Sequence, residues 1–382
     1  MVLRLGLVDL APLTTGGAAT YALAIKQALE SIAGEVEIEL VHFANEASVN
    51  RLRHDDSDRI LYRKTDGVAR SFAGRVRDRL SGRRESSAPT LAQVLKVQQI
   101  DLAWFLAPNR VISSVRDTPF VMTVWDLAHR DVQGFPEFSA EGRWEQREAG
   151  FSQNLGRAFH VITDSRKTGE SLERIYGVYP HNWSSIGLPL PAEVTSDMGL
   201  AHSIPGPYFY YPASYWPHKN HRVLIDALQH MPETTAHLVF SGHDEGHRAK
   251  LEDYVRQQHL DNRVHFHARI TDEEVQGLID GSQAVVMPSF LGPTNYPPLE
   301  ALRRGRPALV SSVHAFDFEP PDGLVFIEAE SVTGWALEMS TALLSKESQS
   351  PWGNLQAPVS KEIREVLTKI GATSRASFSR TL

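Results

Sequence analysis

Short apolar runs alternate with helical patterns along nearly all of the 382 residues. In the first half, the runs that predict strands are LRLGLVD, EIELVHF, LAWFL, FVMTVWD and HVITDS. After about residue 195 the rhythm restarts with PYFYYPA, HLVFSG, RVHFHA, AVVMPS, PALVSS and LVFIEA. Continuous apolar strands separated by helices are typical of parallel sheets that carry helices on both faces. The sequence therefore predicts an α/β fold.

The length and the restart of the pattern predict two domains. A chain of this size is too long for one comfortable core. The stretch 187–207 is rich in Pro, Gly and Ser and is interpreted as the linker. We expect two doubly wound, Rossmann-like domains that face each other across a cleft. They are expected over residues 1–190 and 205–365, with a C-terminal segment, 366–382, packing back on the N-terminal domain.

Composition limits the classes of function. The net charge of −7 argues against a nucleic-acid partner, because phosphate contacts need an excess of Lys and Arg. Zero cysteines exclude disulfides and thiolate zinc sites and fit a reducing compartment. The start of the chain, MVLRLGLVDLAPL, resembles a strand more than a secretion signal. No window approaches 18 apolar residues, so we expect a cytoplasmic protein without membrane spans.

One stretch breaks the pattern. Residues 70–84, RSFAGRVRDRLSGRR, hold six arginines against one aspartate. Phe72, Val76 and Leu80 recur at steps of four, on one face of a predicted helix. Such a segment fits peripheral contact with the inner membrane face or with a lipid-linked substrate. The alternative is a solvated helix or a loop docked by three apolar residues, and the sequence leaves both open.

Residues that follow predicted strands are the first candidates for a binding site, because ligands of open α/β sheets lie beyond the carboxyl ends of the strands. Gly16 and Gly17 follow the first strand and precede a helix, where backbone N–H groups could approach a phosphate. Neither a dinucleotide fingerprint nor a P-loop is present, so an ordinary turn is an equal alternative. Lys219 and Asn220 stand at the mouth of another helix, where a lysine adds positive charge to the helix dipole.

The stretch GPTNYPPLEALRRGRPALV, residues 292–310, places one carboxylate, Glu300, in a stiff turn. Pro297 and Pro298 suit the first turn of a helix, and Gly305 suits its left-handed end. The predicted strand PALVSS follows. A helix that begins at the edge of a sheet offers an anion site at its N-terminus.

Two of these stretches carry a resemblance to a known family. YYPASYWPHKNHRVLIDAL and MPSFLGPTNYPPLEALRRGRPALVSS resemble family 4 of the nucleotide-sugar glycosyltransferases, and in particular a branch of bacterial polysaccharide enzymes. The likeness covers nearly the whole chain and is strongest over residues 208–312. It implies the GT-B fold and retaining transfer of a hexose or deoxyhexose from a nucleoside diphosphate sugar. It also implies that the reaction needs neither a divalent metal nor a cofactor.

The resemblance implies roles for individual residues. Glu300 matches the glutamate that holds the ribose hydroxyls, and Lys219, next to Asn220, matches the lysine on the donor diphosphate. The backbone at Ile270 matches the segment around the nucleobase. The remaining matched positions lie close to the donor phosphates and the sugar, and they are Gly16, Gly17, Pro293, Thr294 and Asn295.

The chain departs from the family pattern at three places. Gly292 replaces the first glutamate of the E-x7-E element, and Ala213 and Ser214 stand where an arginine is usual. Trp125-Asp126 replaces His-Asp after the predicted strand FVMTV. These substitutions leave the recognition of the hexose open.

The chemistry implied by the resemblance is a front-face transfer, in which Lys219 stabilises the departing diphosphate. Candidates for the acceptor side are Asp126, His129 and Arg130, with Asp126 orienting a hydroxyl or acting as a base. The alternative is a surface turn tied by a local salt bridge. The expected acceptor is a glycan, a lipid-linked saccharide or a natural product.

Other functions were weighed against this one. A sugar-nucleotide epimerase of the same fold and a non-catalytic partner that binds nucleotide sugars both remain open. His243 and His247 are four residues apart, which suits a metal, but their stretch is typical of a strand-to-helix loop. We therefore expect no metal site.

Overall fold

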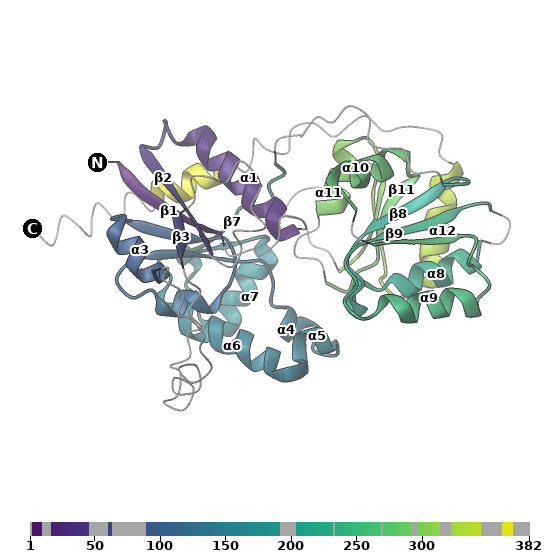
Figure 1. Ribbon diagram of the computed structural model, residues 1–382, viewed down its shortest axis with the longest axis horizontal. Coiled ribbons are helices and arrows are strands. Elements are labelled where there is room, and N and C mark those ends of the chain that lie inside the picture. The colour runs from purple at the N-terminus through teal and green to yellow at the C-terminus, as the bar shows by residue number, and fades with distance from the viewer. Residues whose placement is uncertain are drawn as a thin grey trace, which may run out of the picture. The chain divides into compact units, whose positions relative to one another are not determined.

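The structure of the chain is a computed structural model. It describes residues 2–9, 17–45, 60–62, 89–191, 204–231, 234–268, 270–291, 296–313, 322–344 and 361–369. The chain divides into two compact units (Figure 1). The first unit comprises Met1–Leu127, Glu145–Pro191 and Gln356–Leu382, and the second comprises Ala128–Trp144 and Ala192–Leu355. The predicted α/β class is confirmed in both units.

The first unit is built on a parallel sheet of seven strands among the described residues, in the order β3-β2-β1-β4-β5-β6-β7. The strands are β1 Leu3–Asp9, β2 Ile38–Asn45, β3 Ile60–Tyr62, β4 Leu102–Phe105, β5 Phe120–Val124, β6 His160–Thr163 and β7 Trp183–Ser185. Its main helices are α1 Gly17–Ile32, α3 Leu91–Val97, α6 Arg143–Asn154 and α7 Arg166–Tyr176. A further helix over 361–369 belongs to this unit, where Arg364 Nη2 lies 2.7 Å from Glu35 Oε2.

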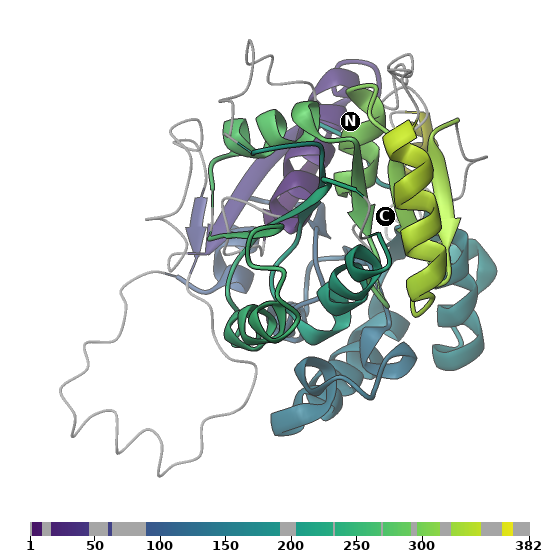
Figure 2. The same ribbon diagram turned by 90° about the vertical axis from the view of Figure 1, so that its right-hand side faces the viewer.

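The second unit has a parallel sheet of six described strands in the order β10-β9-β8-β11-β12-β13. The strands are β8 Tyr208–Pro212, β9 His237–Ser241, β10 Val264–His267, β11 Ala284–Met287, β12 Ala308–Ser311 and β13 Leu324–Ile327. The helices are α8 His221–Gln229, α9 Arg248–Gln257, α10 Asp272–Gly281, α11 Tyr296–Arg303 and α12 Val332–Leu344. Within this unit, α8 and α9 cover one face of the sheet and α10 and α11 cover the other (Figures 1 and 2).

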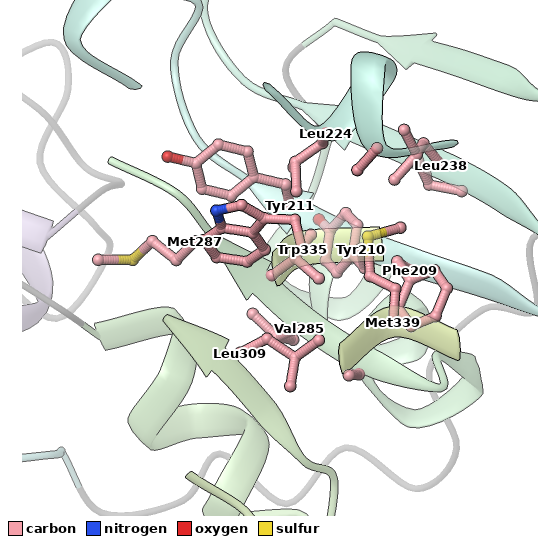
Figure 3. Packing of buried hydrophobic residues seen from close by; sticks show 14 of the residues in the cluster. Phe209, Tyr210, Tyr211, Leu224, Leu238, Val285, Met287, Leu309, Trp335 and Met339 are labelled. Carbon is pink, nitrogen blue, oxygen red and sulfur yellow. The ribbon is translucent and has the colours of Figure 1, made fainter. Parts of the chain in front are cut away.

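The core of the second unit explains why its strands are continuous apolar runs. Consecutive side chains of a strand point to opposite faces, and both faces are covered here. Tyr210 and Tyr211 are therefore both buried, together with Trp335 of α12 (Figure 3). The polar atoms of these three side chains have partners: Tyr210 Oη lies 2.6 Å from Ser241 Oγ, Tyr211 Oη donates to the Lys219 carbonyl at 3.0 Å, and Trp335 Nε1 donates to the Glu328 carbonyl at 3.2 Å.

The unit boundaries differ from the expected ones at two places. Residues 361–365, expected in the C-terminal domain, belong to the first unit. Residues 128–144 were expected in the N-terminal domain, but they pack with the second unit and form the short helices α4 Ala128–Asp131 and α5 Pro136–Ser139. The reason is a set of long-range contacts that the local pattern does not encode, described below.

Three predicted features lie wholly or partly beyond the described residues. The arginine-rich stretch 70–84 is one, and residues 192–203 of the predicted linker and 370–382 of the C-terminal segment are the others. In the part of the chain that the structure describes, no helix is long and apolar enough to span a membrane.

Candidate functional site

The strand orders place a topological switch point in each sheet. In the second unit the chain runs outward from β8 through β9 to β10, and then continues on the other side of β8 with β11. Strands β8 and β11 pair in parallel, with Phe209 opposite Ala284 and Tyr210 opposite Val285. The connections that leave such neighbouring strands diverge at their carboxyl ends, which is where open α/β sheets bind ligands. The corresponding point of the first unit lies between β1 and β4.

The connection after β8 carries Lys219 and Asn220. A short 3-10 turn, Pro217–Lys219, leads into Asn220, which has a left-handed backbone with φ of +55°. Asparagine tolerates this conformation better than most residues. Its Nδ2 donates to the carbonyls of Pro288 at 3.2 Å and Ala329 at 2.8 Å, and Tyr211 Oη donates to the Lys219 carbonyl at 3.0 Å. Lys219, which keeps partial exposure, therefore stands on a backbone that is held from several directions.

His218, the residue before Lys219, links this connection to the one after β11. Its carbonyl accepts a hydrogen bond from the Phe290 N–H at 2.9 Å. Its own N–H and its Nδ1 both approach Glu137 Oε1, at 3.0 and 2.7 Å. The two connections that diverge at the switch point are thus bonded to one another, and to the segment 128–144.

The histidine that opens α8 is kept uncharged. Burial lowers the pKa of His221 to about 3, and the nearby charge of Lys219 lowers it further. At neutral pH this ring is therefore neutral, so the positive charge at this helix end belongs to Lys219 and not to His221.

The segment that holds Ile270 is fixed by a capping box at the start of α10. Thr271 Oγ1 accepts from the Glu274 N–H at 3.2 Å, and Glu274 Oε2 accepts from the Thr271 N–H at 2.7 Å. Ile270 packs against the core of the unit. Its backbone is thereby placed directly before a rigid helix N-terminus.

Glu300 lies on α11, which follows the connection after β11. Burial raises the pKa of its carboxyl from 4.5 to about 7, with Arg303 and Arg304 lowering it and Asp272 raising it. The residue nevertheless keeps some solvent exposure. Four predicted donor-site residues lie in the second unit: Lys219, Asn220 and Ile270 precede helices that follow strands of its sheet, and Glu300 lies on the helix α11.

Other predicted donor-site residues lie outside the described residues, namely Gly16, Pro293, Thr294 and Asn295. The same holds for Gly292, the position of the missing glutamate. Gly17 is described, and it is the first residue of α1, the helix that follows β1.

The acceptor-side candidates are divided between the two units. Asp126 follows β5 in the first unit, and its Oδ1 is ion-paired with Arg147 Nη2 of α6. His129 and Arg130 belong to the second unit, where His129 is fully buried near Trp144 and the Arg130 guanidinium lies 5.7 Å from the same ring. This ion pair joins Asp126 to a residue 21 positions away in the chain, whereas the alternative for this turn was a local salt bridge. The burial of His129 favours a packing role for that residue.

Trp125, which replaces the family histidine, packs edge-on against Tyr21 of α1, with ring centroids 5.7 Å apart. The helix that follows the glycine pair and the turn of Asp126 are therefore neighbours within the first unit. Among the described residues, no group of three or more His, Asp or Glu side chains is placed to hold a metal ion.

Sequence reasoning missed Glu137 and His218. The carboxylate and the imidazole are 81 residues apart in the chain, so no local motif joins them. The available signal was weak: a single glutamate in the otherwise aromatic stretch FPEF, and a histidine directly before the predicted lysine.

The fold of the two units is shared with proteins of known structure. Two doubly wound parallel-sheet units are the GT-B fold of glycosyltransferases, and structural neighbours share it across nearly the whole chain. HepE of Anabaena, solved in complex with UDP and glucose, has a TM-score of 0.65 and 15% identity, over 98% of this chain and 100% of that one. Sucrose-phosphate synthase from Thermosynechococcus elongatus has a TM-score of 0.66 and 16% identity, over 99% and 100%.

Sequence comparison finds a family model that matches part of the chain. Residues 202–354, most of the second unit, match the family of glycosyl transferases group 1. A curated relative, the O-antigen chain mannosyltransferase RfbU of Salmonella typhimurium, is 23% identical over 182 residues, which are 48% of this chain. The match spans about half of that relative, 50% of its length. These similarities support a GT-B glycosyltransferase.

Proposed function

We propose that the protein is a retaining glycosyltransferase. It moves a hexose or deoxyhexose from a nucleoside diphosphate sugar to a hydroxyl of a glycan, a lipid-linked saccharide or a natural product. The observation that carries the proposal is the Lys219 connection at the β8–β11 switch point, in the region that matches glycosyl transferases group 1.

The donor is assigned to the strand-to-helix connections of the second unit. Lys219 and Asn220 stand where the diphosphate would bind, and the lysine supplies the charge that a departing diphosphate needs. Glu300 accepts hydrogen bonds from the ribose hydroxyls, and the backbone at Ile270 contacts the nucleobase. The further donor contacts come from Gly16, Gly17, Pro293, Thr294 and Asn295.

The reaction breaks the bond between the anomeric carbon and the phosphate oxygen, and the electron pair leaves with the diphosphate. The acceptor oxygen forms the new bond on the face that the diphosphate leaves, so the anomeric configuration is retained. The proton of the acceptor hydroxyl passes to the departing phosphate. In this scheme Lys219 is the group that stabilises the growing negative charge, and neither a metal ion nor a cofactor takes part.

Asp126 and Arg130 are proposed for the acceptor side. Asp126, held by Arg147, orients the hydroxyl or accepts its proton. His129 belongs to the same proposal only as a packing residue, because it is fully buried. A cytoplasmic location, with peripheral contact of residues 70–84 at the inner membrane face, completes the proposal.

The experiment begins with binding. The purified protein is heated with UDP-glucose, GDP-mannose and other nucleotide sugars, because a ligand that binds the native state raises its apparent stability. UDP and glucose are the ligands named for the HepE structure, and the RfbU relative is named a mannosyltransferase, so both donors enter the panel.

The donor that stabilises the protein is then tested for transfer. Transfer to a saccharide, with the product in the donor's anomeric configuration, is the expected result. Inversion would refute the retaining assignment. Conversion of the donor to its epimer would instead indicate the epimerase, and binding without turnover would indicate the non-catalytic partner.

A further inference from the structure

Glu137 and His218 form a buried pair that has no role in the function proposed above. Glu137 lies on α5, in the segment 128–144 that packs with the second unit. Its Oε1 accepts hydrogen bonds from the His218 N–H at 3.0 Å and from its Nδ1 at 2.7 Å. The side chains are only 4% and 9% exposed. With a carboxylate as acceptor, the ring donates from Nδ1, so both bonds are assisted by charge.

Aromatic rings enclose this pair. The centroids of Phe138 and Phe135 lie 4.9 and 6.3 Å from that of His218, and Phe290 lies 5.4 Å from Phe135. An apolar enclosure strengthens a hydrogen bond and makes the loss of either partner costly. The pair is therefore a strong constraint on the backbone at His218.

The constraint acts directly on Lys219, the next residue. Three bonds hold this turn from its other sides: Tyr211 Oη to the Lys219 carbonyl, and the Asn220 amide to the carbonyls of Pro288 and Ala329. Glu137 supplies the acceptor for the peptide N–H just before Lys219. Without it, the His218 end of the turn loses its bonds to α5 and keeps the bond from the Phe290 N–H, while the other end keeps its bonds.

Glu137 itself is out of reach of a ligand in this conformation. Its second oxygen, Oε2, has no exposed surface and no hydrogen-bond partner. An effect of Glu137 on a donor must therefore pass through His218.

We propose that Glu137 is a positioning residue for the donor diphosphate: through the His218 backbone and ring, it sets the place of Lys219. This inference rests on the proposed donor site. A displacement of a charged group by about 1 Å can cost about a hundredfold in rate. Loss of Glu137 should therefore lower the rate of transfer and the affinity for the diphosphate, and leave the affinity for the nucleoside unchanged.

The test uses the full chain with Glu137→Gln, which keeps Oε1 but removes the charge. The matched control is Glu141→Gln, the same change at an exposed glutamate of the same segment. Three quantities are measured: kcat and KM with the donor, the Kd of the nucleoside diphosphate and the Kd of the nucleoside alone. We expect Glu137→Gln to lower kcat by about 10- to 100-fold and to weaken the binding of the nucleoside diphosphate. The nucleoside should bind as to wild type, and Glu141→Gln should change nothing.

The decisive arm is the double variant. If Glu137 acts through Lys219, then adding Glu137→Gln to Lys219→Ala should cost little more than Lys219→Ala alone. Independent, multiplying effects would overturn the proposal, as would an equal loss of nucleoside affinity or no loss at all. If Glu137→Gln fails to fold, Glu137→Asp, which keeps the charge on a shorter side chain, replaces it.

The inference and the proposed function fail in different ways. If wild type binds no nucleoside diphosphate, both are overturned. If wild type binds it and Glu137→Gln binds it equally well, only the positioning role is overturned.

Discussion

The turn after β8 and the turn after β5 both follow buried parallel strands, and the bonds described hold them in different ways. Around Lys219 the hydrogen bonds described hold the backbone, from Glu137, Tyr211 and Asn220. At Asp126 the carboxylate itself is ion-paired with Arg147. The first arrangement holds the main chain that carries Lys219, and the second holds the side-chain carboxylate of Asp126 in an ion pair. The difference teaches that a turn suited to a ligand is recognised by what holds its backbone, more than by its charged residue.

The largest effect should come from the two charged residues of this comparison. Lys219→Ala should lower kcat by about 10² to 10³, because one group that stabilises leaving charge is lost. It should also weaken nucleoside diphosphate binding. Asp126→Asn should lower transfer while leaving the Kd of the donor unchanged, and steady-state kinetics with donor titrations measure both. The control is Lys250→Ala, at an exposed lysine of α9, and equal rates for the two lysine variants would break the comparison.

The cores of the two units offer the next contrast. Trp104 and Trp335 are both buried, each with its indole N–H bonded, to Thr123 Oγ1 and to the Glu328 carbonyl. Truncation of either to alanine should cost about 3–5 kcal/mol of unfolding free energy. Denaturant unfolding measures the cost, and added nucleotide sugar should raise the stability of the Trp335 variant more than that of the Trp104 variant, because the donor is assigned to the second unit. Equal rescue of both by the ligand would argue against a donor site in the second unit.

The pH dependence of stability should run in opposite directions in the two units. The raised pKa of Glu300, about 7, means that the folded state binds this proton more tightly than the unfolded chain, whose carboxyl has a pKa of 4.5. Its contribution is full below pH 4.5 and is lost as the pH rises through 7. The Tm of Glu300→Gln should therefore rise relative to that of wild type as the pH is raised from 5 to 8.

His160 of the first unit provides the opposite case. Burial lowers its pKa to about 4 from 6.5, so the cost appears as the pH falls below 6.5. The Tm of His160→Gln relative to that of wild type should therefore be higher at pH 4.5 than at pH 8. A relative Tm that rises toward low pH for Glu300→Gln, or toward high pH for His160→Gln, would contradict the burial of that group.

The smallest effects are expected at two capping boxes. Thr90 opens α3 in the first unit and Thr271 opens α10 in the second, each bonded reciprocally to the residue three positions on. Loss of either threonine hydroxyl by substitution with alanine should cost about 1 kcal/mol. Only Thr271→Ala should also weaken nucleoside binding, because Ile270 precedes that cap. Calorimetry with the nucleoside separates them, and weakening by Thr90→Ala would refute the assignment.

The sequence predicted the sheets well because a strand covered on both faces is a continuous apolar run. LRLGLVD coincides with β1, and PYFYYPA contains β8. The short strands β3 and β7, at the sheet edges, carry little of this signal. No sequence signal indicated that residues 128–144 belong to the second unit, because the bonds described there join Glu137 to a histidine 81 residues away.

The same logic separates the parts of the site. Lys219, Asn220 and Glu300 were named because each follows a predicted strand in a stretch with a recognisable pattern, and their role in donor binding stays a prediction. The ion pair of Asp126 and the burial of His129 depend on which helices pack beside the turn, and a sequence pattern of single residues does not record that packing.

A crystal structure of the protein with its nucleoside diphosphate tests the central claim most directly. The account predicts the diphosphate within hydrogen-bonding reach of Lys219 Nζ, with the ribose hydroxyls at Glu300. A nucleotide bound elsewhere, with the β8–β11 connections empty at saturating ligand, would contradict it.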